Sequence, residues 1–302
     1  MYYKEKLNQQ QIAELISLSR SQVSRYLTEA EEIGIVRIEI EEVDDRAHDL
    51  ERELEEALGL KKAVVVYQLN STTASIRKTI GRAAARYLSD ILQSNDVIGL
   101  TAGYTLREML NFLERPEVEE LELVQLMGGA GATALQTYPE ELAREFAQKL
   151  GAVLFSLHAP LVVENKAVRD LFLATNSVQK IAKKWETLSV VVMGVGNISS
   201  EQLIFKSGWF TELDLKSVKD AGAVGVICGR FYDEAGNLVK VPVEERIIAT
   251  DLDLFKKAGH TIAVAGGSSK IVPLLAAIRG GFCNSLVTDD KTANVLLVKA
   301  QS

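Results

Sequence analysis

The sequence predicts an α/β protein in two parts, a small helical domain followed by a larger domain of alternating strands and helices. Three observations lead to this prediction. Two short amphipathic helices stand near the N-terminus, an acidic stretch follows at residues 41–45, and buried strands alternate with helices from residue 63 onward. Such alternation is typical of a mostly parallel sheet covered on both faces, so we expect a Rossmann-like architecture for the larger domain.

The pair of N-terminal helices is predicted over residues 8–34. Asn8 can cap the first helix with Gln11 reaching back, and Ser19 with Gln22 repeats the arrangement for the second. Apolar residues recur at helical spacing in both helices: Ile12, Leu15 and Ile16, then Val23, Tyr26 and Leu27. Two helices joined by a tight turn predict a helix-turn-helix, with an ordinary helical hairpin as the alternative.

The exposed face of the second helix has side chains suited to a DNA groove. They are Arg20, Ser21, Gln22, Ser24 and Arg25. Arg pairs with guanine, Gln with adenine, and Ser with bases or phosphates, and recognition helices contact bases through their N-terminal residues. Glu29, Glu31 and Glu32 follow, so the segment lacks a strongly basic footprint. We therefore expect double-stranded operator DNA to be bound by more than one copy.

Residues 35–40 alternate apolar and polar side chains and predict a strand, which makes the N-terminal domain winged-helix-like. A charged helix is predicted over residues 46–58, with Leu50, Leu54 and Leu58 along one face. It is either a linker helix that pairs with a twin or the first helix of the next domain. We expect a DNA-binding domain with linker helix over residues 1–52 and a ligand-binding domain over residues 53–302.

The larger domain is expected to alternate between two kinds of element. The predicted strands are residues 63–67, 96–100, 121–126, 153–157, 189–194, 223–228, 261–265 and 285–287. The predicted helices are residues 75–89, 104–112, 138–150, 165–173, 176–184, 213–221, 250–258, 271–279 and 291–298.

Composition excludes several classes of protein. The 302 residues are enough for two domains, and 47% hydrophobic and 25% charged residues are typical of a soluble globular protein. The net charge of −7 argues against a protein that coats nucleic acid or a membrane surface. There is no signal-like N-terminus and no apolar run long enough to cross a bilayer, so we expect a cytoplasmic protein without membrane partners.

Metal and cofactor chemistry is not indicated. Cys228 and Cys283 lie far apart in apolar surroundings and are expected to be buried free thiols. The three histidines form no metal-ligand spacing, and neither a nucleotide-hydrolase phosphate loop nor a Gly-x-Ser-x-Gly elbow occurs. Gly194-Val195-Gly196 begins like a dinucleotide fingerprint, but Ser199 replaces the third glycine, so only a place at a pocket rim is expected.

Three glycine-rich loops follow predicted strands, where ligands bind in open α/β sheets. The candidate ligand-binding residues in them are Gly103, Tyr104, Thr105, Gly128, Gly129, Gly266, Gly267, Ser268, Ser269 and Lys270. Exposed backbone amides beside a helix start and a lysine make an anion site. The alternative is that the glycines only permit tight turns. Asp289, Asp290 and Asp233 either bind sugar hydroxyls or cap a helix or a turn.

Two groups of residues carry a resemblance to a known family. They are residues 10–13, 19–20 and 23–25 near the N-terminus, and Gly103, Thr105, Gly128, Gly129, residues 227–231 and 265–267, Lys270, Thr288 and Asp289 beyond it. Together they resemble the SorC/DeoR-type bacterial sugar-responsive transcription regulators over nearly the whole chain. The resemblance implies an effector domain like the sugar-phosphate isomerase/deaminase fold but without catalysis, a homodimer or homotetramer, and a phosphorylated sugar whose phosphate is held by Gly103, Tyr104, Thr105 and Lys270.

Four positions depart from the family pattern. Relatives commonly have Trp where Ala102 stands, a small residue at Tyr104 and an acidic residue at Val226. Some have at Met127 a lysine able to form a Schiff base, which a thioether cannot do.

We therefore expect a DNA-binding regulator of carbohydrate metabolism genes, controlled by a phosphorylated sugar, with no catalytic residues, metal or cofactor. Two alternatives remain open. One is a sugar-phosphate isomerase or deaminase, for which Asp289 and Asp233 are the candidate general bases. The other is a regulator that binds DNA independently of any effector.

Overall fold

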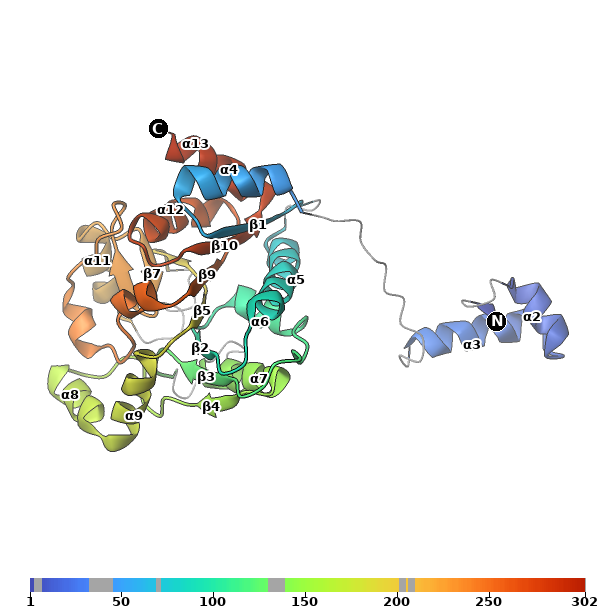
Figure 1. The fold of residues 1–302 in the computed structure, drawn as a ribbon, viewed down its shortest axis with the longest axis horizontal. Coiled ribbons are helices and arrows are strands. Elements are labelled where there is room, and N and C mark those ends of the chain that lie inside the picture. Colours follow the sequence, from blue (N-terminus) through green and yellow to red (C-terminus); the bar gives the residue numbers. More distant parts are fainter. Residues whose placement is uncertain are drawn as a thin grey trace. The chain divides into compact units, whose positions relative to one another are not determined.

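The computed structural model describes residues 1–2, 7–32, 46–68, 72–129, 139–200, 205 and 210–301. The chain divides into two compact units, residues 1–45 and 46–302 (Figure 1). The predicted strand at residues 35–40, and with it the wing, lies outside the described residues.

The first unit contains helices α2 (Gln9–Leu15) and α3 (Arg20–Glu32), as the capping signals predicted. Asn8 and Gln11 exchange the two hydrogen bonds of a capping box, each 2.9 Å long. Ser19 and Gln22 do the same at the start of α3. The caps therefore define both helix starts, because they satisfy amide groups that the helix leaves unpaired.

A small core joins these two helices. Ile12, Ala13 and Val23 are buried, with Leu7, Leu18 and Leu27 packed against them. Not every residue of the two apolar patterns is buried: Leu15, Ile16 and Tyr26 are exposed, Leu15 by 65%. The two packed helices bury only the stripes that face each other, and these side chains point away from that contact.

Helix α4 (His48–Leu58) belongs to the second unit. Leu54 is fully buried in its core, and the helix packs against β1 (Lys62–Val66) and α13 (Asp290–Ala300). Helix α4 is thus packed within the larger unit. The expected boundary between residues 52 and 53 falls within α4, whereas the two units meet between Asp45 and Arg46.

Seven parallel strands form the main sheet of the second unit (Figure 1). In spatial order they are β1, β10 (Ser285–Asp289), β9 (His260–Val264), β5 (Val190–Met193), β2 (Val97–Leu100), β3 (Glu122–Gln125) and β4 (Val153–Phe155). Every neighbouring pair is parallel, which confirms the predicted parallel sheet.

Both faces of this sheet are covered. Successive strand residues contribute to opposite cores, as Val64 and Val65 do in β1. The helices with residues in one core are α5 (Thr73–Ile91), α6 (Tyr104–Leu110) and α7 (Pro139–Leu150). Those with residues in the other core are α4, α9 (Asn176–Trp185), α11 (Glu212–Asp220), α12 (Ile271–Arg279) and α13.

Helices α5 and α6 make an unusually close contact at Gly81. A Cβ atom at this position would lie 2.7 Å from the backbone nitrogen of Met109. Only glycine lets the two helices approach this closely. Because Arg77 lies one turn before Gly81 and Tyr104 begins α6, this contact also sets the spacing of side chains at the ends of both helices.

Residues 223–228 do not join the main sheet. Strand β7 (Gly225–Ile227) pairs antiparallel with β6 (Gly196–Asn197) and β8 (Arg230–Tyr232) in a separate three-stranded sheet. Cys228 and Gly229 both have positive φ, as in a two-residue hairpin turn of type I′. An apolar run of this length predicts a strand without specifying its partner.

The remaining elements are short. Helix α8 (Lys166–Ala174) lies near its predicted place, and the helix predicted at residues 250–258 is instead the 3-10 turn η2 (Leu252–Lys257). Two further 3-10 turns are η1 (Pro242–Arg246) and η3 (Ser268–Lys270). Of the helices described, none combines the length and apolar character needed to cross a membrane.

Candidate functional site

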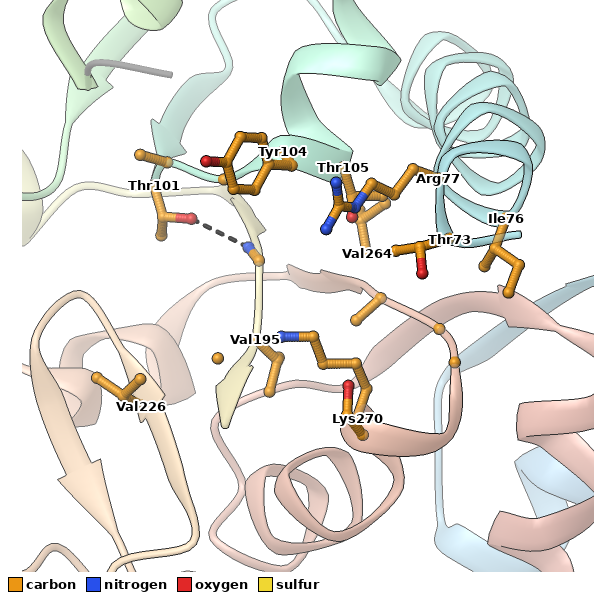
Figure 2. Close-up of a pocket in the computed structure, with 18 of the residues that line it drawn as sticks. Thr73, Ile76, Arg77, Thr101, Tyr104, Thr105, Val195, Val226, Val264 and Lys270 are labelled. Carbon is orange, nitrogen blue, oxygen red and sulfur yellow. Dashed lines mark hydrogen bonds between the residues drawn. The ribbon is translucent and has the colours of Figure 1, made fainter. Parts of the chain in front are cut away.

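A cavity of about 300 Å³ lies where the central strands β9, β5 and β2 end (Figure 2). It is lined by Thr73, Ile76 and Arg77, by residues 101–105, 194–196 and 264–270, and by Met127, Val226, Cys228 and Gly229. The carboxyl ends of parallel strands are where ligands bind in open α/β sheets. The structure therefore brings the first and third predicted glycine-rich loops together around one space, and the Gly194–Gly196 segment joins them.

The third loop begins at Gly266 and ends in η3, immediately before α12. Gly267 has a φ of 95°, which favours glycine. Its amide donates to Asp289 Oδ2 at 3.1 Å and to Thr292 Oγ1 at 2.8 Å. These contacts hold the loop from behind, and Lys270 extends from its end into the cavity (Figure 2).

The first loop follows β2 and contains Gly103, Tyr104 and Thr105, all of which line the cavity. Gly103 has a φ of 155° and precedes the first residue of α6. The hydroxyl of Thr101 accepts a 3.0 Å hydrogen bond from the amide of Gly194 (Figure 2). This bond ties the loop after β2 to the loop after β5.

Two positively charged side chains face the cavity. The guanidinium of Arg77 stacks on the ring of Tyr104, with 4.7 Å between its central carbon and the ring centroid. Burial and, to a smaller extent, the charge of Arg77 lower the pKa of Lys270 to about 8. Among the described residues that line the cavity there is no carboxylate. An anion placed between Arg77 and Lys270 would be favoured by both charges.

Arg77 was missed by sequence reasoning. The alternation of elements predicted α5, but the face of α5 that meets the cavity depends on how the helix is rotated against the sheet. The sequence feature that could have indicated Arg77 is a basic residue one turn into a helix that follows a buried strand.

Four of the described lining residues have apolar or weakly polar side chains. They are Met127, Val195, Val226 and Cys228, and each is at most 6% exposed. Burial raises the pKa of the Cys228 thiol to about 12, so this group is neutral. This thiol and that of Cys283 are free and buried, as predicted.

Asp289, a predicted ligand contact, does not line the cavity. Its carboxylate is buried, accepts from the amide and hydroxyl of Thr292 at 2.9 and 2.7 Å, and caps α13. It also accepts from Gly267. Asp289 therefore positions the third loop from behind.

Two other predicted acidic residues have structural roles. Asp233 accepts from Asn237 in an exposed turn, and hydrogen bonds from Asn237 lower its pKa. Asp290 accepts from the amide of Gln68. Neither residue lines the cavity.

Gly128 and Gly129 were also expected at the ligand and do not line the cavity. The amide of Gly128 donates to Ile248 O at 2.9 Å and that of Gly129 to Ala159 O at 2.8 Å. A Cβ atom on Gly128 would collide with Pro160. These glycines permit a close approach between backbone segments, which was the alternative explanation for them.

The predicted DNA-contacting residues Arg20, Ser21, Gln22, Ser24 and Arg25 occupy the first half of α3. All except Ser24 are exposed, and Ser24 is half-buried. Oε1 of Gln22 accepts from the amide and hydroxyl of Ser19, each at 3.0 Å. Because bidentate recognition of adenine uses both ends of the amide, capping competes with that use of Gln22.

The described residues contain no candidate metal site. Within the described parts of the chain, no three His, Cys, Asp or Glu side chains lie close enough to hold an ion.

Comparison with known sequences identifies the family. Residues 45–298 match the Sugar-bind family model, described as a "Putative sugar-binding domain". The Deoxyribonucleoside regulator of Bacillus subtilis (strain 168) is 31% identical over 297 residues, covering 98% of this chain and 95% of the relative. The chain belongs to the SorC/DeoR family of sugar-binding transcriptional regulators. A second SorC/DeoR relative, the Sorbitol operon regulator of Klebsiella pneumoniae, is 28% identical over 302 residues, covering 98% of this chain and 95% of the relative.

Solved structures of transcriptional regulators have the same fold. The full-length Sorbitol Operon Regulator SorC from Klebsiella pneumoniae superposes with a TM-score of 0.76 at 26% identity, covering 98% of this chain and 96% of that one. A transcriptional regulator from Streptococcus pneumoniae TIGR4 gives 0.78 at 26% identity, covering 84% and 98%. The relatives are transcriptional regulators and not enzymes, and the enzymatic alternative is set aside on that ground.

Proposed function

We propose that this SorC/DeoR-family regulator controls carbohydrate metabolism genes, and that a phosphorylated sugar in the cavity sets its affinity for operator DNA. One observation carries the proposal. Arg77 and Lys270 face one cavity together with two glycine-rich loops, and no carboxylate stands among its described lining residues. A phosphate dianion is the small-molecule group that such a site favours most.

In this proposal the phosphate lies near the start of α12. Lys270 contributes charge, and Ser268 and Ser269 contribute hydroxyl and amide donors. Arg77 offers a planar fork of donors that suits phosphate oxygens. Gly103, Tyr104 and Thr105 line the cavity beyond the phosphate.

Operator recognition is assigned to α3, with Arg20 and Arg25 as its exposed positive groups. A single copy of so weakly basic a segment would bind DNA poorly, so the proposed unit is a homodimer or homotetramer. The effector would act by binding one arrangement of the paired units more tightly than another.

The names of the relatives support the gene class. They are regulators of deoxyribonucleoside, sorbitol and erythritol functions. We extend the general class, carbohydrate metabolism, to this chain.

Fluorescence anisotropy with the promoter of the protein's own operon tests the proposal. Specific, salt-dependent binding is expected, with a Kd that changes at least about fivefold when the effector is added. Lys270→Ala should abolish that response and leave effector-free binding intact. The matched control is Lys257→Ala, because Lys257 is exposed and does not line the cavity. A specific DNA complex that responds to no sugar phosphate would favour the effector-independent regulator instead.

A further inference from the structure

The described residues that line the cavity are of two chemical kinds. The polar and charged side chains come from residues 73–77, 101–105 and 268–270. We call Met127, Val195, Val226 and Cys228 the apolar wall, because their side chains are apolar or weakly polar and almost fully buried. In Figure 2 Val226, on the β7–β8 hairpin, is separated across the cavity from Arg77 and Thr73 on α5.

The side chains of the apolar wall offer almost no hydrogen bonds to a ligand. They consist of methyl groups, a thioether and a neutral thiol, which are at most weak partners. The backbone of Val226 is also engaged, since this residue pairs with Gly196 on one side and Phe231 on the other. The apolar wall therefore offers a ligand few hydrogen-bond partners, either from its side chains or from the backbone of Val226.

Such a wall discriminates against hydroxyl groups. A sugar hydroxyl pressed against it gives up hydrogen bonds to water without replacement, whereas a methylene group gains from burial. A buried hydroxyl without a partner weakens binding by roughly tenfold or more. The site therefore favours a ligand whose carbon atom facing Val226 carries no hydroxyl group.

We infer that the effector is a deoxy sugar phosphate, with its deoxygenated carbon against the apolar wall and Val226 as the residue that sets this selectivity. The inference rests on the proposed phosphate-binding role of Lys270 and Arg77. It adds to that role the chemical class of the rest of the ligand.

Binding of paired phosphates to the full-length protein tests the inference by calorimetry. The pairs are 2-deoxyribose 5-phosphate with ribose 5-phosphate, and 2-deoxyglucose and 3-deoxyglucose 6-phosphates with glucose 6-phosphate. In at least one pair, the Kd of the deoxy member should be lower by about tenfold or more. Equal or weaker binding of every deoxy member overturns the inference and leaves the phosphate site standing. If no phosphate binds, including inorganic phosphate, the proposed function fails as well.

Two variants test the role of Val226. Val226→Asp supplies a hydroxyl acceptor and should reduce or reverse the preference. Val226→Thr is nearly isosteric, so the variant should fold like the parent. It should reduce the difference in Kd between the deoxy phosphate and its hydroxylated counterpart. Val153→Thr is the matched control, because Val153 is exposed on β4 outside the cavity. An unchanged preference in Val226→Thr would overturn the assignment to this residue.

Discussion

Arg77 and Tyr104 stack on each other at the cavity, with 4.7 Å between the guanidinium carbon and the ring centroid. The two residues come from different helices, α5 and α6. The stack holds the Arg77 charge in place, and no carboxylate of the described residues pairs with it. Cation–ring attraction leaves the edge of the guanidinium available to donate hydrogen bonds.

Arg77→Ala should raise the Kd for sugar phosphates by roughly tenfold or more, because a charge-assisted contact is lost. Arg77→Lys keeps the charge but loses the planar fork, so it should recover only part of the affinity. Calorimetry with the full-length protein measures both. Arg52→Ala on the exposed face of α4 is the control, and wild-type affinity in Arg77→Ala would contradict the assignment.

Phosphate affinity should fall as the pH rises through about 8. Below that value Lys270 is protonated and attracts the phosphate, and above it the charge is lost. Phosphate monoesters are already dianions there, since their second pKa is about 6. Calorimetry between pH 7 and 9.5 should show a rise in Kd of roughly tenfold. Lys270→Arg stays protonated over this range, so an equal rise in that variant would refute the role of Lys270 in the pH dependence.

Asp289→Asn should destabilise the protein by about 1–3 kcal/mol, because the buried carboxylate accepts from Gly267 and Thr292 and an amide cannot accept all of these bonds. Phosphate binding should weaken as well, since the loop that carries Lys270 loses its support. Denaturant unfolding and calorimetry measure the two effects. Asp233→Asn, in an exposed turn, is the control: it should leave phosphate binding unchanged and cost less stability, because water replaces its lost hydrogen bonds. Full stability in Asp289→Asn would show that the loop does not depend on this carboxylate.

Arg25→Ala should weaken operator binding and reduce the dependence of binding on salt by about one counterion. Arg25 is exposed on α3, and the cavity residues belong to the other compact unit. Its phosphate affinity should therefore stay at the wild-type value. Anisotropy over a salt series gives the slope, and an unchanged slope would remove Arg25 from the interface with phosphates.

The parts that the sequence predicted correctly depend on local chemistry. Both capping boxes of the N-terminal helices involve residues three positions apart, so their geometry follows from the sequence alone. The Gly266–Gly267 turn after a strand, with Lys270 beside the next helix start, was predicted for the same reason. Strand, turn and helix start occur together within a few residues.

The residues whose place relative to the cavity the sequence did not predict depend on distant contacts. Gly128 has the same local pattern as a ligand loop, but a glycine is needed there because the backbone of Pro160 leaves no room for a Cβ atom. Asp289 lies at the end of a strand, as a ligand-binding residue would. Its carboxylate is held by hydrogen bonds from Thr292 and Gly267. Arg77 could not be placed without the rotation of α5.

The backbone contact between α5 and α6 at Gly81 has an evolutionary consequence. The separation of Arg77 from Tyr104 is governed by how closely these helices approach, and residue 81 limits that approach without touching the cavity. A homologue with a larger side chain at this position would need its helices further apart and its cavity correspondingly reshaped. Selection for a new effector can therefore act at residue 81 while every cavity-lining residue stays the same.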